Sequence, residues 1–135
     1  MAQGMREVTA GLAALRGFSS DAIQRIRQFL DETATVLAME PEVLVFDEPF
    51  SSLDYPGVKQ VLKQIVSLHR SGHTVFVAAH DLEKVIAHAD RLVIMNNGSV
   101  VKDGMPSQLL GELETYAIRE PCASRLGMEV PSWLN

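Results

Sequence analysis

The chain has 135 residues, which is enough for one domain with a hydrophobic core and too few for two ordinary domains. Hydrophobic residues make up 47%, which fits a globular protein and argues against disorder. A net charge of −5 without clusters of Lys and Arg argues against direct nucleic-acid binding. The single cysteine, Cys122, cannot form an internal disulfide, so a reducing compartment is expected.

No apolar run is long enough to span a bilayer, and the segment Met1–Arg16 lacks the apolar core of a signal peptide. We therefore expect a cytoplasmic protein, which could still dock on a membrane partner.

The first predicted element is a helix from about Asp21 to Met39, where apolar residues recur at helical spacing. Side chains at 19–21 can cap its N-terminus, and Pro41 lies just past its end. The run Val43–Phe46 that follows is wholly apolar, which predicts a strand buried on both faces.

Further elements alternate between helix and strand. A helix runs from near Pro56 to a stop at Gly72, and a second buried strand follows at Thr74–Ala79. Next come a short helix face with Leu82, Val85 and Ile86 and a strand at Leu92–Met95. A hairpin turn at Asn97-Gly98 leads into a strand with Val100 and Val101 that ends at Asp103-Gly104. A helix is expected at Gln108–Tyr116, and the remainder, with Pro121, Gly127 and Pro131, is expected to be irregular. This order predicts an α/β fold with a largely parallel sheet flanked by helices.

Two adjacent carboxylates, Asp47 and Glu48, end the first apolar strand. Neighbouring residues on a pleated strand point in different directions, so one carboxylate can hold Mg²⁺ while the other orients or deprotonates a water for attack on phosphorus. The alternative is an acidic strand end that only caps the next turn.

The loop after these carboxylates contains Pro49, Ser51, Ser52 and Asp54, which favour turns and carry no further signal on their own. His80 ends the second apolar strand, where it could reach a γ-phosphate or the attacking water. The alternative is a histidine with local hydrogen bonds only. Its neighbour Asp81 could cap the following helix.

Together these segments resemble an ABC ATPase. The runs Val43–Pro49, Ser51–Asp54 and Val77–Asp81 resemble its Walker B motif, D-loop and H-loop in order and spacing. Three sequence segments resemble the ATPase subunits of energy-coupling-factor importers for cobalt, nickel or biotin. They are "LAMEPEVLVFDEP", "AHDLEKVIAHADRLVIM" and, after these, "LETYAIREP".

The resemblance implies the roles of five residues. Asp47 would hold Mg²⁺, Glu48 would be the general base, and His80 would contact the γ-phosphate of ATP. Ser52 and Asp54 of the D-loop would face the nucleotide site of a partner subunit across a dimer.

Two motifs of this family are missing. The phosphate-binding loop G-x-x-x-x-G-K-S/T is absent, since none of the four lysines follows a glycine. Counted back from Leu37, the LSGGQ signature would fall at Ile23–Arg27, where its glycines are gone and Arg25 and Arg27 stand. These arginines could attract phosphate, or they form the solvated face of a helix. His69 and His73 are four apart, but we expect Gly72 to separate them as surface residues.

We therefore predict a partial P-loop NTPase-like core that lacks the P-loop strand, in a single domain over 1–135. Residues 1–38 would be a degenerate signature region, 39–111 the Walker B to H-loop core, and 112–135 a C-terminal extension. The expected function is that of a truncated or degenerate ATP-binding subunit of an importer for a metal or vitamin, not active alone. The alternatives are a non-catalytic docking module and an inactive remnant.

The resemblance also implies partners and a place in the cell. These are a transmembrane transporter subunit, a second ATPase subunit, or both, at the cytoplasmic side of the inner membrane. Without the P-loop strand, unpaired edges and apolar surface beside Val43–Asp47 would favour a homo-oligomer.

Overall fold

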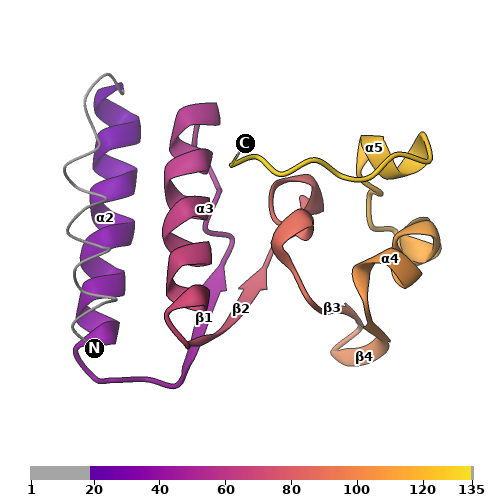
Figure 1. Ribbon diagram of the computed structural model, residues 1–135, viewed down its shortest axis with the longest axis horizontal. Helices are drawn as coiled ribbons and strands as arrows, with labels where there is room; N and C mark the ends of the chain where they lie inside the picture. The colour runs from indigo at the N-terminus through magenta and orange to yellow at the C-terminus, as the bar shows by residue number, and fades with distance from the viewer. Residues whose placement is uncertain (1–18, 135) are drawn as a thin grey trace. The chain divides into compact units, whose positions relative to one another are not determined.

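The computed structural model describes residues 19–134 (Figure 1). The expectations for Met1–Arg16, including the missing signal peptide, lie outside these residues. The described chain falls into two compact units, the first ending at Ala79 and the second beginning at His80. No helix between residues 19 and 134 has the length and apolar character needed to cross a membrane.

Helix α2 (Ser20–Leu37) begins at a capped N-terminus, because Ser19 Oγ accepts a hydrogen bond from the backbone N–H of Ala22 at 3.3 Å. Its buried stripe, with members three or four residues apart, consists of Ala22, Ile26, Leu30, Thr33 and Leu37. The predicted helix is confirmed, with its ends within two residues of the expected ones.

Helix α3 (Tyr55–Arg70) starts after Asp54, whose Oδ1 accepts a hydrogen bond from the N–H of Gly57 at 2.9 Å. It stops before Gly72, whose φ of 108° is a backbone conformation that suits glycine. Helices α2 and α3 contact each other and stand side by side (Figure 1). The predicted second helix is therefore confirmed.

Strands β1 (Val43–Asp47) and β2 (Thr74–Ala78) pair in parallel, with Val45 opposite Phe76 and Asp47 opposite Ala78. The helix between them makes the crossover that parallel strands require. The predicted parallel pairing is confirmed for these two strands. Within residues 19–134, β1 and β2 pair only with each other.

One face of this strand pair is covered and the other is open. Leu44 on the covered face is 3% exposed, whereas Val43, Val45 and Phe76 on the open face are 49%, 69% and 54% exposed. Phe46 also lies on the covered face, and its ring is 5.4 Å from that of Phe29 in α2. The prediction that both strands are buried on both faces is wrong, because α2 and α3 lie on one side only and no described element covers the other.

The second unit is built on a hairpin of β3 (Leu92–Asn96) and β4 (Ser99–Gly104), which pair antiparallel. Asn97 and Gly98 have φ values of 49° and 76°, and positive φ at both central residues is what a tight hairpin turn of this twist requires. The predicted hairpin is confirmed.

Short helices complete this unit. They are the 3₁₀ turns η1 (Leu82–Lys84) and η2 (Ile86–His88), helix α4 (Pro106–Leu109), the 3₁₀ helix η3 (Leu110–Tyr116) and helix α5 (Cys122–Arg125). Three expectations need correction. The helix face at Leu82–Ile86 is two 3₁₀ turns, the helix expected at Gln108–Tyr116 is mostly 3₁₀, and the remainder expected to be irregular contains α5.

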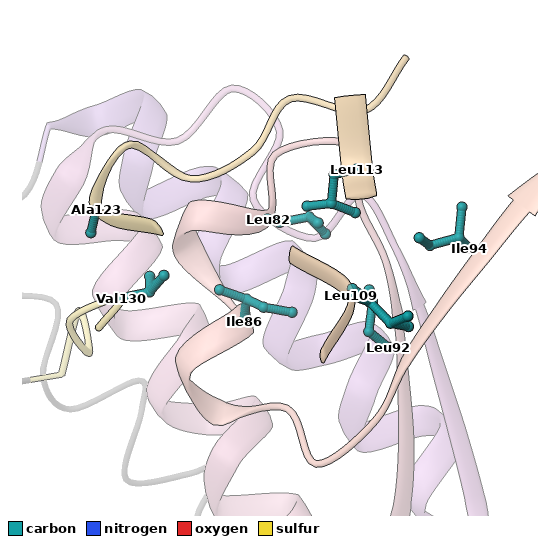
Figure 2. Packing of buried hydrophobic residues seen from close by; sticks show 8 residues of the cluster. All are labelled: Leu82, Ile86, Leu92, Ile94, Leu109, Leu113, Ala123 and Val130. Atoms are coloured by element: carbon teal, nitrogen blue, oxygen red, sulfur yellow. The ribbon is translucent and has the colours of Figure 1, made fainter. Parts of the chain in front are cut away.

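The hydrophobic core of the second unit is small. Its side chains converge from every element of the unit except β4 (Figure 2), and they are Leu82, Ile86, Leu92, Ile94, Leu109, Leu113, Ala123 and Val130.

Arg91 and Asp103 pair at the hairpin, with Arg91 Nε donating to Asp103 Oδ1 at 2.6 Å and Nη2 to Oδ2 at 2.5 Å. The guanidinium lowers the pKa of Asp103, chiefly through these hydrogen bonds.

Candidate functional site

The candidate site starts at the carboxyl end of β1. Asp47 is the last residue of the strand and is exposed, on the same face as Val45. Glu48 follows with a φ of 47°, while its N–H donates to the carbonyl oxygen of Ala78 at 2.8 Å. The backbone therefore leaves the strand at Glu48 in a left-handed conformation, which gives the two neighbouring carboxylates different settings.

The loop after Glu48 is compact. The N–H of Ser51 donates to the carbonyl of Glu48 at 3.1 Å, and that of Leu53 to the carbonyl of Phe50 at 3.4 Å. Ser52 has a φ of 59° and is exposed. Phe50 is buried and anchors this loop, a role that sequence reasoning missed. A bulky apolar residue between Pro49 and a pair of serines is the signal that could have indicated it.

Asp54 has a local structural role as the N-cap of α3, through Gly57. A carboxylate at this position also interacts favourably with the positive end of the helix dipole. Its side chain is held at one place in the loop, and the residue stays exposed. The stretch 47–54, which leads from the end of β1 to the N-cap of α3, thus contains Asp47, Glu48, Ser52 and Asp54.

His80 is the first residue of the second unit and is exposed. Its neighbour Asp81 stands at the N-cap position of η1 but makes no side-chain cap hydrogen bond. It forms an ion pair with Lys84 at 3.1 Å instead. The expected capping role of Asp81 is therefore wrong, because Lys84 one turn later attracts its carboxylate.

The segment Ile23–Arg27 lies inside α2. The N–H of Ile23 donates to the carbonyl of Ser19 at 2.9 Å, so the backbone donors of this segment take part in the helix and are not available to a ligand. Ile26 is fully buried, and Arg25 and Arg27 are exposed. This placement fits the reading of the arginines as a solvated helix face.

An open hollow on the exposed side of α2 includes Arg27, but Asp31 and Glu32 line it too. Carboxylates beside the guanidinium make the hollow a poor anion site.

The two histidines expected at the surface, His69 and His73, both make local contacts with backbone carbonyl groups. Nδ1 of His69 lies 3.3 Å from the carbonyl oxygen of His73, and Nδ1 of His73 lies 2.9 Å from the carbonyl oxygen of Pro41.

The described residues could bind Mg²⁺ only if waters and phosphate oxygens supplied most of its ligands. Among residues 19–134 no cluster of three or more His, Cys, Asp or Glu side chains could hold a metal. The exposed Asp47 offers one carboxylate. This fits an ion that keeps several waters and takes its other ligands from phosphate oxygens.

Curated proteins match much of the chain. The energy-coupling factor transporter ATP-binding protein EcfA2 of Mycoplasmopsis synoviae is 45% identical over 80 residues, which is 59% of this chain and 26% of that protein. The EcfA2 protein of Clostridium perfringens is 39% identical over 99 residues, which is 73% of this chain and 32% of that protein. The chain thus spans about a quarter to a third of the length of these relatives. No family model matches.

Solved structures share the fold. CbiO1 from Clostridium perfringens, described as part of the ABC transporter complex cbiONQ, matches with a TM-score of 0.60 at 26% identity and covers 93% of this chain and 51% of that one. A nucleotide-free ATP-binding cassette from an ABC transporter matches with a TM-score of 0.60 at 17% identity and covers 83% and 45%. The fold is thus that of ABC ATPase domains, within the P-loop NTPase class. The chain is a homologue of ABC transporter ATP-binding domains, and energy-coupling factor ATP-binding proteins are among its relatives.

Proposed function

We propose that this chain supplies the hydrolysis side of an ATP-binding subunit in an ABC importer for a metal ion or vitamin. One observation carries the proposal. Asp47 and Glu48 stand at the carboxyl end of a parallel strand, and a compact loop leads from them directly to a helix capped by Asp54. Ligands of open α/β sheets bind at this end of the strands.

Each residue of the proposed site has a distinct task. Asp47 would hold Mg²⁺ through its waters, and this ion would supply positive charge at the phosphate oxygens of ATP. Glu48 orients the attacking water and accepts its proton. His80 would contact the γ-phosphate, as its resemblance to the H-loop histidine implies. Ser52 and Asp54 face the nucleotide of a second ATPase subunit.

These 135 residues need further phosphate-binding groups. A triphosphate is held mainly by backbone N–H groups, a helix N-terminus and a lysine. The sequence contains no G-x-x-x-x-G-K-S/T. Without such groups, Asp47 and Glu48 offer negative charge to a negative ligand. Titration calorimetry with Mg-ATP tests this: the chain alone should show no binding at micromolar concentrations, and micromolar affinity would refute the requirement.

The proposal includes partners and a location. The chain would act at the cytoplasmic side of the inner membrane, against a transmembrane subunit and a second ATPase subunit. The two-stranded sheet, open on one face, also supports self-association when no other partner covers it. Light scattering tests that point, since a monodisperse monomer at high concentration would contradict it.

A second candidate function is a docking module without catalysis, or an inactive remnant. The absence of signature glycines at Ile23–Arg27, and the burial of Ile26 inside α2, favour this reading. Glu48→Gln separates the candidates in cells. If transport is unchanged by this variant while deletion of the chain abolishes transport, the docking module is correct. If deletion has no effect either, the chain is a remnant.

A further inference from the structure

We propose that Asn97, in the turn between β3 and β4, is a site of spontaneous deamidation that converts it to aspartate and isoaspartate. The reactants are the Asn97 side-chain amide, the backbone nitrogen of Gly98 and water, so no enzyme or cofactor takes part. Glycine after asparagine favours the reaction, because no Cβ atom hinders the approach of the nitrogen. The inference is independent of the proposed function, since it uses none of the residues of the proposed site.

The reaction has two steps. In the first, the backbone nitrogen of Gly98 attacks Cγ of Asn97, and the new C–N bond closes a cyclic imide. The bond from Cγ to the side-chain nitrogen breaks, and this nitrogen takes up the proton of the Gly98 amide and leaves as ammonia. In the second step, water opens the imide at either carbonyl. One product is ordinary aspartate, and the other is isoaspartate, in which the main chain runs through Cγ.

The structure leaves both reacting groups accessible. Asn97 and Gly98 are exposed, and within residues 19–134 neither the Asn97 side chain nor the Gly98 N–H makes a hydrogen bond. Apart from its chain neighbours, no atom of the described chain lies within 4 Å of the place that a Cβ atom on Gly98 would take. Imide closure requires rotation about the Cα–C bond of Asn97, and these empty surroundings leave room for it.

A second pair of the same kind, Asp103 and Gly104, is protected. It can form the same imide by losing water, but both oxygens of the Asp103 carboxylate accept hydrogen bonds from Arg91, at 2.6 and 2.5 Å. Gly104 pairs with Leu92 in the hairpin, and Gln108 Oε1 lies 3.6 Å from the place of its missing Cβ atom. The carboxylate and the backbone of this pair are therefore both held, unlike those of Asn97 and Gly98.

Isoaspartate at position 97 would disturb the hairpin. It adds one carbon atom to the main chain of a turn that pairs Asn96 directly with Ser99. Strand β3 supplies Leu92 and Ile94 to the core of the second unit, where they are 8% and 1% exposed. Ordinary aspartate is compatible with the turn, because it accepts a positive φ about as readily as asparagine. The isoaspartate product should therefore destabilise the second unit, whereas aspartate should not.

Peptide mapping of the full 135-residue chain tests the inference. The chain is incubated in neutral buffer at physiological temperature and digested with trypsin, which releases residues 92–102 and 103–119 as separate peptides. Electron-transfer fragmentation then locates isoaspartate. It should be about tenfold more abundant at position 97 than at Asn96, which is followed by a residue with a Cβ atom. Equal amounts at positions 96 and 97, or no product at 97, would overturn the inference.

The variant Asn97→Gly is the matched control. Glycine accepts the positive φ of this position and has no side-chain amide, so the turn is kept and the reaction is removed. Ion-exchange chromatography follows the acidic species that forms in the parent, because either product adds a negative charge. This species should be absent from the variant. Its formation in Asn97→Gly at the parent rate would assign the charge change to another residue and overturn the inference.

Comparison with the unfolded chain measures the protection of each pair. The same incubation in urea gives the rate of isoaspartate formation without the fold. Folding should slow the reaction at Asp103 about tenfold more than at Asn97, because only the first pair is held by its surroundings. Arg91→Ala should reduce the protection of Asp103 and leave Asn97 unchanged. Equal protection of the two pairs would contradict the assignment of Asn97 as the reactive site.

The consequence for the hairpin has its own test. The isoaspartate form of the incubated chain is isolated and compared with the variant Asn97→Asp, which has the same added charge and an ordinary main chain. The isoaspartate form should unfold at a lower urea concentration than Asn97→Asp, which should unfold like the parent. Equal unfolding midpoints of the two forms would show that the turn accepts the extra atom and would refute this consequence.

Discussion

The backbone N–H of Glu48 donates to the carbonyl oxygen of Ala78 across 2.8 Å, one residue beyond the end of β1. The bond extends the ladder between the two parallel strands while Glu48 already has a φ of 47°. A left-handed backbone is unfavourable for any residue with a Cβ atom, so the proposed base occupies a strained position held by its neighbour strand.

Glycine at this position should relieve the strain. We expect Glu48→Gly to be more stable than Glu48→Ala by about 0.5–1 kcal/mol, because both lose the side chain and only alanine keeps the strain. Urea unfolding of the two variants measures the difference. Equal stability would show that the conformation at Glu48 is not strained.

The open face of β1 predicts contrasting effects at adjacent residues. Leu44→Ala should lower the free energy of unfolding by about 2–5 kcal/mol, since Leu44 is buried against the helices. Val45→Ala should change it by less than about 0.5 kcal/mol, because Val45 is exposed. Denaturant unfolding of both variants checks this. The measurement is made in dilute protein, where the chain is monomeric, and a large loss at Val45 there would mean that this face is covered within one chain.

A buried side-chain amide on α3, that of Gln64, lowers the stability of the first unit. Gln64 is 5% exposed, and its Oε1 has no hydrogen-bond partner. Gln64→Met, similar in length and without this polar atom, should raise stability by about 1 kcal/mol. Gln64→Glu should lower stability, because it places charge at the same position. A stabilised Gln64→Glu variant would contradict this account.

The capping role of Asp54 can be separated from its proposed role at a dimer interface. Asp54→Ala should lower stability by about 1 kcal/mol through loss of the hydrogen bond to Gly57. Asp54→Ser keeps a capping oxygen and should recover most of that loss, although it removes the carboxylate. Thermal unfolding compares the variants. Equal destabilisation by serine and alanine would show that the cap is not the source of the effect.

The Arg91–Asp103 pair predicts a pH dependence. Arg91→Ala should move the pKa of Asp103 up towards its ordinary value of 3.8, measurable by NMR titration of the carboxyl group. Because the pKa is lowered in the folded state, the pair's contribution to stability is present above the ordinary value and is lost as pH falls through the lowered pKa. An unchanged Asp103 titration in Arg91→Ala would show that the pair does not form in solution.

Much of the fold follows from local chemistry. The stripe from Ala22 to Leu37 and the caps at Ser19 and Asp54 define the two long helices, since apolar period and capping side chains both indicate the same boundaries. The turn at Asn97-Gly98 is equally local, because few residue pairs accept two positive φ values.

Other features depend on what surrounds an element. The apolar run Val43–Phe46 has the composition of a fully covered strand, yet its odd-numbered side chains are exposed because no described element covers that face. Asp81 could have been a cap, but the position of Lys84 decides its pairing. The anchoring role of Phe50 depends on the burial of its loop, which composition does not reveal.

The most direct test of the central claim is hydrolysis by the chain joined to a phosphate-binding segment. The parent fusion should hydrolyse Mg-ATP, and Glu48→Gln should bind the nucleotide as well but hydrolyse it about 100-fold more slowly or worse, as loss of a general base predicts. A Glu48→Gln fusion that hydrolyses Mg-ATP at the parent rate would contradict the assignment of Asp47 and Glu48 as the hydrolysis side.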